Sequence, residues 1–339
     1  MCEYDKYTVE IEFLSSVETP LHADTIFGHI CWAYRYLNDE EDLKIFLSLY
    51  DENPTQPLLL VSNGFPKGYL PKPVIPPINQ EDLQKVVKED ERIEASFKIK
   101  TIKKADIIPK EIFKKLQRNK IRPLDLFAAM YENDNYRGIM REKEGHQAVM
   151  VQHNTIDRIQ GSARRGGLYA QDETFFDPTQ SAFEVYLKTS FFSFEELTRI
   201  FEFIRMQGFG RDKSTGKGHF SLKIRGGIDL PESAEPNAFM TLSSYVPAKN
   251  DPIKGYYNII HKYGKLGGAY AAGSPDVYNN PFKVPLIMFS AGSTFIDDHY
   301  NNRRIYGCLL DNVHSNGGIR HYAYAFPVGI SIEDDHADL

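Results

Sequence analysis

A short segment between Gly208 and Gly218 combines glycines, cations and hydroxyls at spacings that suit phosphate binding. It reads GFGRDKSTGKG, and its glycines are Gly208, Gly210, Gly216 and Gly218. Glycine tolerates positive φ and close approach by a ligand, and such turns can aim successive N–H groups at an anion. The donors suited to phosphate or to a ribose 2′-OH are Arg211, Lys213, Ser214, Thr215 and Lys217. The segment therefore predicts a contact with a phosphate-bearing ligand; the alternative is a flexible turn with incidental lysines.

The same letters suggest a nucleotide-binding P-loop, but the spacing excludes one. A P-loop needs a glycine five residues before Gly216, where this chain has Arg211, and a hydroxyl after Lys217, where it has Gly218. The segment also follows a predicted helix and enters a predicted strand, which reverses the P-loop order. A nucleotide-binding enzyme is thus a distant alternative.

A second cluster occupies residues 153–169, which read HNTIDRIQGSARRGGLY. The apolar residues on either side predict a long β-hairpin over about 149–177 with a Gly/Arg-rich tip. Basic side chains that could face a polyanion are Arg158, Arg164 and Arg165. Ile156, Ile159 and Leu168 could act as apolar wedges between bases, and Tyr169 could stack on one. An ordinary exposed hairpin with a basic tip is the alternative.

Two histidines could support chemistry. His22 and His153 are candidates for general acid/base catalysis of metal-free RNA cleavage, although the sequence fixes a partner for neither. No histidine shows metal-ligand spacing, so no metal and no other cofactor is predicted. The three cysteines lie far apart, which argues against a disulfide framework and favours a reducing cytoplasm.

Alternating and helical apolar patterns predict the elements that would carry these clusters. Residues 7–13 alternate as a strand, and a helix with apolar residues on one face follows up to Leu37. A second strand near 183–187 leads to a helix that Ser193 and Glu196 begin as a capping box and Gly208 ends. After the glycine-rich segment, residues 220–224 alternate again. Strand, helix, loop and strand in this order indicate half of a ferredoxin-like unit, with the opening strand and helix as the other half.

The rest of the chain divides into less regular parts. Pro-rich residues 51–80 predict an irregular connection, and 80–94 and 109–119 predict short amphipathic helices. The predicted organisation is a first domain over 1–225, a second sheet-based domain over 236–332 and an acidic tail over 333–339.

Charge is unevenly distributed. The formal net charge is −6, yet residues 98–122 hold ten basic and two acidic side chains. Such a basic tract on an acidic chain suggests one face for a polyanion and another for protein neighbours, or else a solvated lysine-rich helix and strand. No apolar run approaches the roughly 20 residues of a membrane-spanning helix.

These segments together resemble the repeat-associated mysterious proteins (RAMPs) of CRISPR effector complexes. Three stretches carry the resemblance: LHADTIFGHICWA after the first strand, HNTIDRIQGSARRGGLY, and GFGRDKSTGKGHF between the last helix and last strand of the first unit. The match is most similar to the fourth Csm-type subunit of the type III-A complex. The resemblance implies an α+β fold of two ferredoxin-like (RRM-like) domains with antiparallel sheets, a glycine-rich loop over 208–218 and a protruding thumb hairpin.

In function, the resemblance implies a non-catalytic RNA-binding subunit in antiviral defence. It would cap the foot of the complex, hold the 5′ handle of the guide RNA (crRNA), dock the large polymerase-like subunit and adjoin the backbone RAMP subunit. The thumb would enter the nearby guide–target duplex. The implied RNA contacts are the glycine-rich segment together with His22, His153, Asn154, Thr155 and the three thumb arginines. The alternatives are a RAMP-type endoribonuclease that processes repeat RNA, and the equivalent type III-B subunit.

Overall fold

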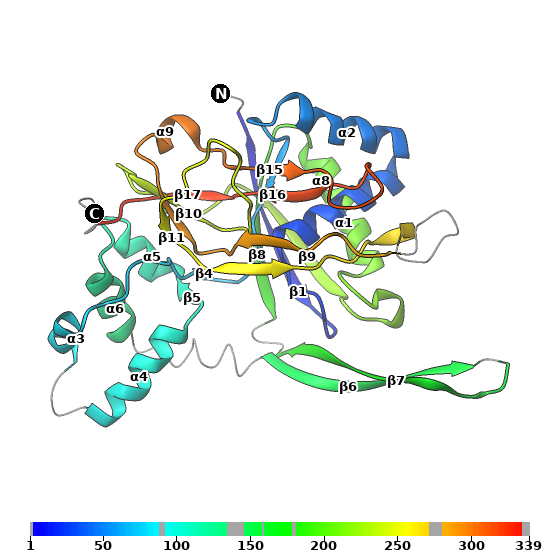
Figure 1. The fold of residues 1–339 in the computed structure, drawn as a ribbon, viewed down its shortest axis with the longest axis horizontal. Coiled ribbons are helices and arrows are strands. Elements are labelled where there is room, and N and C mark those ends of the chain that lie inside the picture. The colour runs from blue at the N-terminus through cyan, green and yellow to red at the C-terminus, as the bar shows by residue number, and fades with distance from the viewer. Residues whose placement is uncertain are drawn as a thin grey trace.

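A computed structural model describes residues 3–87, 92–133, 146–157, 159–177, 181–270 and 280–333 (Figure 1). The chain forms a mixed α/β body with antiparallel sheets. A helical lobe and a long hairpin extend from the lower side of this body in Figure 1. None of the helices found in those six ranges is long and apolar enough to cross a membrane.

The main sheet is built from the strands that the sequence predicts, with two additions. Its order is β2 (Leu59–Val61), β8 (Ala182–Thr189), β1 (Asp5–Phe13) and β9 (Phe220–Gly226), and β3 (Phe65–Pro66) also pairs with β8. Every pairing is antiparallel. Central β1 pairs Val9 with Val185 on one side and with Ile224 on the other. Strand–helix–strand followed by strand–helix–strand, in this order, is the split βαβ arrangement of a ferredoxin-like unit.

Two helices complete this unit. Helix α1 (Ala23–Leu37) buries Ile26 and Ile30, and α8 (Phe194–Gln207) buries Leu197 and Phe201, so each turns one apolar face to the core. The predicted capping box of α8 is confirmed: the Ser193 side chain accepts from the Glu196 N–H, and the Glu196 carboxylate accepts from the Ser193 N–H.

The segment between the two halves of the unit is more regular than predicted. It contains α2 (Glu40–Glu52), β4 (Tyr69–Pro71), α3 (Gln80–Val86), α4 (Arg92–Lys104), β5 (Ile107–Pro109), α5 (Lys110–Leu116) and α6 (Pro123–Tyr131). The expectation of an irregular connection over 51–80 is wrong where β2, β3 and β4 lie. Prolines flank or end these short strands, so the strands do not need an N–H at those positions.

The hairpin is confirmed and is longer than expected. Strand β6 (His146–Asp157) pairs with β7 (Ser162–Phe176), from His146 opposite Phe176 to Asp157 opposite Ser162, with an irregularity between Asn154 and Ile156. Near its root, Val17 forms a two-way backbone bridge with Thr174, at 3.0 and 2.9 Å. The root of the hairpin is therefore attached by backbone hydrogen bonds to the segment that follows β1.

The C-terminal part contains one four-stranded sheet and two two-stranded sheets. A four-stranded sheet has the order β11 (Gly255–Tyr256), β14 (Thr294–Ile296), β10 (Ala238–Thr241), β17 (Pro327–Ile330). Two-stranded sheets pair β12 (Ile259–Lys262) with β13 (Leu286–Phe289), and β15 (Gly307–Leu310) with β16 (His321–Tyr324). The helical turns in the described residues here are η3 (Gly268–Tyr270) and four-residue α9 (Tyr300–Arg303). A second ferredoxin-like unit with two packed helices thus stays a prediction.

The two predicted domains share one hydrophobic core. Phe27 of α1 stacks on Tyr322 of β16 with ring centroids 4.7 Å apart, and the Tyr322 hydroxyl accepts from the Val61 N–H. The same buried cluster extends from β1 to Ile332. Residues 227–237 form no helix or strand, as a connection would, but the packing across the connection is continuous.

Candidate nucleic-acid interface

The glycine-rich loop is closed by its own backbone. Phe209 N–H donates to the Gly218 carbonyl at 2.8 Å, and Gly218 N–H donates to the Ser16 carbonyl at 2.9 Å. Gly218 has φ +67°, and a Cβ there would lie 2.0 Å from the Phe209 carbonyl oxygen. Gly210 has φ +83° and lies against Thr19, where a Cβ would come within 2.7 Å. At these two positions glycine is required by packing within the chain, which corrects the expectation that it makes room for a ligand.

Lys217 occupies the centre of a buried ionic cluster beneath this loop. Its ammonium donates to a Glu18 carboxylate oxygen and lies 2.7 Å from Glu173 Oε1, and only 7% of the residue is exposed. Ser16 Oγ donates to Glu173 Oε2 at 2.7 Å, and His153 Nε2 lies 2.9 Å from Glu173 Oε1. The cluster joins three segments: residues 16–18, the glycine-rich loop and the hairpin. We call it the Lys217 cluster.

Charge balance explains the stability of this cluster. Burial acts to raise the pKa of Glu173, but hydrogen bonds from Lys217, Ser16 and His153 outweigh it and hold that pKa below its usual range. Burial acts to lower the pKa of Lys217, and hydrogen bonds to Glu173 and Glu18 outweigh it and raise that pKa. Both groups are therefore charged at neutral pH. The assignment of Lys217 as a phosphate ligand needs revision, because its ammonium already has two carboxylate partners.

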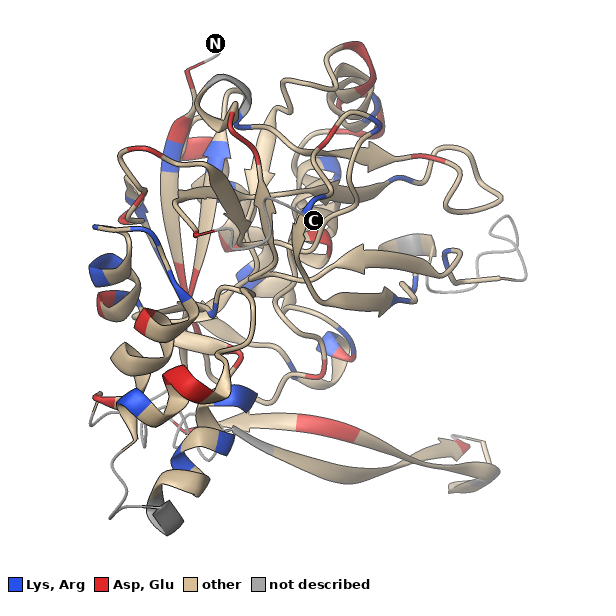
Figure 2. Cartoon of the chain, turned by 60° about the vertical axis from the view of Figure 1, so that its left-hand side comes forward, with Lys and Arg blue, Asp and Glu red and all other residues tan. Residues whose placement is uncertain are grey.

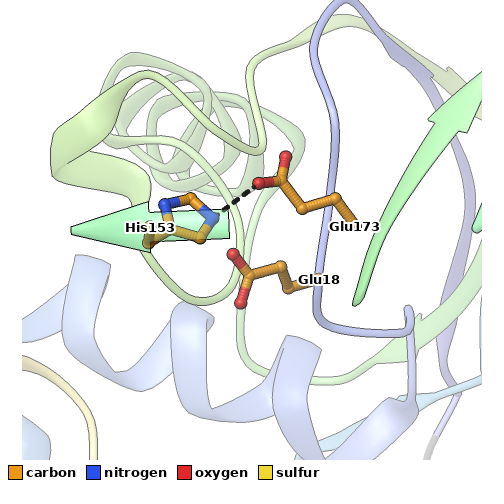
Figure 3. A group of neighbouring side chains, drawn as sticks. All are labelled: Glu18, His153 and Glu173. Atoms are coloured by element: carbon orange, nitrogen blue, oxygen red, sulfur yellow. Dashed lines mark hydrogen bonds and ion pairs between the residues drawn. The ribbon is translucent and has the colours of Figure 1, made fainter. Parts of the chain in front are cut away.

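The same carboxylates form a potential metal-ligand group. Within the described ranges, Glu18, His153 and Glu173 place one ligand atom each within 4.8 Å of one another (Figure 3). Lys217 Nζ contacts both carboxylates and lies 3.4 Å from His153 Nε2. The ammonium group of Lys217 thus occupies the position that a metal ion would take between these carboxylates. Sequence spacing gave no hint of it, since the acids lie 155 positions apart and 44 or more from Lys217.

The remaining donors of the loop point outward. Ser214 and Thr215 are exposed within η2 (Lys213–Thr215). Arg211 is 57% exposed and lies 3.8 Å from Glu18 and from Asp212, so its charge is partly balanced. Lys213 has no carboxylate partner among the described residues, and burial lowers its pKa. The N–H groups of Lys213 and Ser214 likewise lack an acceptor in that part of the chain. The Thr215 hydroxyl already donates to the Asp212 carbonyl at 2.8 Å. Among the described residues, the loop therefore offers the Lys213 cation beside the Lys213 and Ser214 N–H groups and the exposed Ser214 hydroxyl.

The hairpin presents its predicted wedge residues to solvent. Ile159 is 98% exposed at the turn, and Ile156 and Leu168 are 63% and 66% exposed on the two strands. Asn154 and Thr155 are also exposed, whereas His153 is turned into the Lys217 cluster and stacks on Tyr169. The Asp157 carboxylate accepts from the Ile159 and Gln160 N–H groups and so shapes the turn. Arg158 and the side chains of Arg164 and Arg165 lie outside the described residues.

His22 lies away from the loop, in a second buried cluster. Its Nδ1 is 2.6 Å from Lys262 Nζ, which pairs with Asp24 at 2.9 Å. Burial and the nearby Lys262 charge lower the pKa of His22 to about 4. Asp24 also lies 4.0 Å from His321. This cluster connects the start of α1 to β12 and β16, and the described contacts of His22 lie within it rather than with the glycine-rich loop or the hairpin.

The loop geometry gives a stability prediction. Gly218→Ala should lower the free energy of unfolding by about 3 kcal/mol or more, because it combines positive φ with a clash against the Phe209 carbonyl. Gly216→Ala is the matched control: φ is +91° there, but a Cβ meets no atom within 4 Å, so only the backbone cost of about 1 kcal/mol applies. Denaturant unfolding of both variants measures the difference, and equal losses would contradict the loop closure.

Comparisons with known proteins agree with this architecture. No protein-family model and no curated protein matches the chain. Over 97% of its length it is similar to 99% of a chain in the crystal structure of a Csm1–Csm4 cassette in complex with AMPPNP, with 15% identity and a TM-score of 0.54. Over 96% it is similar to 99% of a chain in the crystal structure of a Csm3–Csm4 subcomplex of the type III-A CRISPR-Cas interference complex, with 15% identity and a TM-score of 0.52. Csm4 is the component that both assemblies contain. The chain therefore shares its fold with chains of these two Csm4-containing assemblies, as the motif resemblance predicted.

Proposed function

We propose that this chain is a non-catalytic, RNA-binding subunit of a type III-A CRISPR effector complex that holds the 5′ handle of the guide RNA. The observation that carries the proposal is the Lys217 cluster, which fixes the glycine-rich loop and the root of an exposed hairpin to the segment that follows β1. Two RNA-facing parts are thereby held in one fixed relation, in a chain whose fold is that of proteins from such complexes.

In this proposal, residues 211–215 on the outer side of the loop bind the RNA phosphates. Burial disfavours the charge of Lys213, and no carboxylate of the described residues balances it, so an RNA phosphate beside it would provide a counter-charge. Ser214 supplies an exposed hydroxyl, whereas the Thr215 hydroxyl would have to leave the Asp212 carbonyl to bind a phosphate. Arg211 can exchange its contacts with Glu18 and Asp212 for a phosphate. Lys217 takes the role of an internal anchor.

The hairpin acts as the thumb. Its exposed isoleucines and Leu168 suit insertion between bases, since apolar side chains can separate stacked base pairs and rest on the bases. The fixed root would resist the force of this insertion. The partners in this proposal are the guide RNA, the guide–target duplex, a large polymerase-like subunit of the Csm1 kind and a backbone subunit of the Csm3 kind.

Binding of handle RNA tests the assignment of Lys213. Lys213→Gln should lower the slope of log affinity against log salt concentration by roughly 0.7, the value for one phosphate contact on a single strand. The control Lys223→Gln removes an exposed lysine from β9 and should leave the slope unchanged. Titrations of labelled handle RNA over a range of salt concentrations measure the slopes. An unchanged slope in Lys213→Gln would contradict the contact.

A cleavage assay tests the non-catalytic part of the proposal. Purified protein incubated with repeat RNA, with and without divalent metal, should leave the RNA intact. His22 has little capacity as an acid at neutral pH with its pKa near 4, and His153 is held by Glu173. Site-specific cleavage that is abolished by His22→Ala or His153→Ala would replace the scaffold function with a processing endoribonuclease.

A further inference from the structure

The helical lobe carries a cationic surface that the glycine-rich loop and the thumb leave unused. Figure 2 shows Lys and Arg recurring along the helices of the lobe. Several of these charges are already balanced: Lys110 pairs with Glu184, Lys114 with Glu111 and Asp229, and Arg122 with Asp125. Lys98 lies over the Tyr131 ring, 4.3 Å from its centroid.

The outer face of α4 differs from these balanced positions. Lys100, Lys103 and Lys104 are exposed, and their side chains make no ion pair or hydrogen bond with any described residue. Phe97 lies three to seven residues before them, roughly one to two helical turns, and is 71% exposed. Positions 97, 100 and 104 share one helix face, while Ala95 and Ile102 on the other side are buried. An exposed aromatic ring and three unbalanced cations are therefore presented together.

A purely structural role explains only part of this pattern. Lysines in the last turn of a helix offset the negative end of its dipole, which accounts for Lys103 and Lys104. The Lys72 ammonium already accompanies this helix end, as it donates to the Ile102 and Lys103 carbonyls at 2.9 and 3.2 Å. The dipole accounts for neither Lys100 nor the exposure of Phe97, which costs hydrophobic free energy as long as nothing covers the ring.

We infer that this face of α4, formed by Phe97, Lys100 and Lys104 with Lys103 at its edge, is a second contact for single-stranded RNA. Cations that follow a backbone, next to an aromatic ring on which a base can stack, are the two elements of sequence-tolerant single-strand binding. An acidic protein surface would use the lysines but would not need the π-face of the ring. Both figures place α4 and the thumb on the lower side of the body, so one strand can leave the thumb towards the lobe.

The choice of RNA as partner rests on the proposed function, but the surface is distinct from the loop. The test therefore uses a 15-nucleotide oligouridine without handle sequence and the full-length protein. The triple variant K100Q/K103Q/K104Q should lower the salt slope by roughly 2, from about 0.7 for each lost phosphate contact. The control K6Q/K249Q/K265Q removes three exposed lysines outside the lobe and should leave the slope unchanged.

Phe97 separates RNA stacking from simple charge attraction. Phe97→Ala should weaken oligouridine binding by roughly fivefold or more, whereas Phe97→Tyr keeps the ring and should bind as the unmodified protein does. Both changes are on an exposed helix position, so both variants should fold. Equal slopes for the two triple variants, or unchanged binding in Phe97→Ala, would overturn the inference. If poly-glutamate competes equally well against the unmodified protein and against Phe97→Ala, the surface would be assigned to an acidic protein instead.

Two controls keep the two proposals apart. Lys213→Gln should weaken binding of handle RNA and leave oligouridine binding at α4 unchanged, so either site can fail without the other. In a reconstituted complex, 4-thiouridine placed in the guide RNA or in the single-stranded flank of the target should crosslink to the 97–104 peptide from one of the two strands. A crosslink from neither strand would overturn the inference.

Discussion

The ammonium group of Lys217 is the contact on which the arrangement of the interface depends. It lies between carboxylates from two segments that are far apart in sequence, and it belongs itself to a third. A lysine side chain is long enough to reach both acids from the closed end of the loop. Removal of one partner from a buried ion pair costs roughly 3–5 kcal/mol, because it leaves a buried charge without a counter-charge.

This single contact links local chain geometry to the proposed activity. Gly218 allows the loop to close on Phe209, and the closure directs Lys217 inwards beneath the loop. The same closure leaves Lys213, Ser214 and Thr215 on the outside. Glu173, held by Lys217, fixes the hairpin root beside the Val17–Thr174 bridge. The donor beneath the loop, Lys217, thus stabilises the fold, while donors on the outer side of the loop remain available to bind a ligand.

Much of the fold could be predicted, because its signals are local. Alternation in β1, the Ser193 capping box and the position of Gly208 after α8 all follow from neighbouring residues. The Lys217 cluster could not be predicted, since Glu18 and Glu173 meet that lysine only after β1, β7 and the loop have packed together. Helix α4 was missed for a different reason. Isoleucine and threonine alternate with lysines along it, which weakens its helical pattern. The apolar patterns predicted the order of the elements in the first unit, whereas the roles of the side chains within the loop became clear only from their positions in the structure.

Hydrogen exchange at backbone amides in Lys217→Met tests the anchoring role most directly. We expect faster exchange in the loop and, across a gap in sequence, at residues 171–175 of β7, while amides of β1 keep their protection. The control Lys213→Met should leave the hairpin root as protected as in the unmodified chain. Faster exchange confined to the loop, with residues 171–175 unchanged, would contradict the claim that Lys217 holds the loop and the hairpin together.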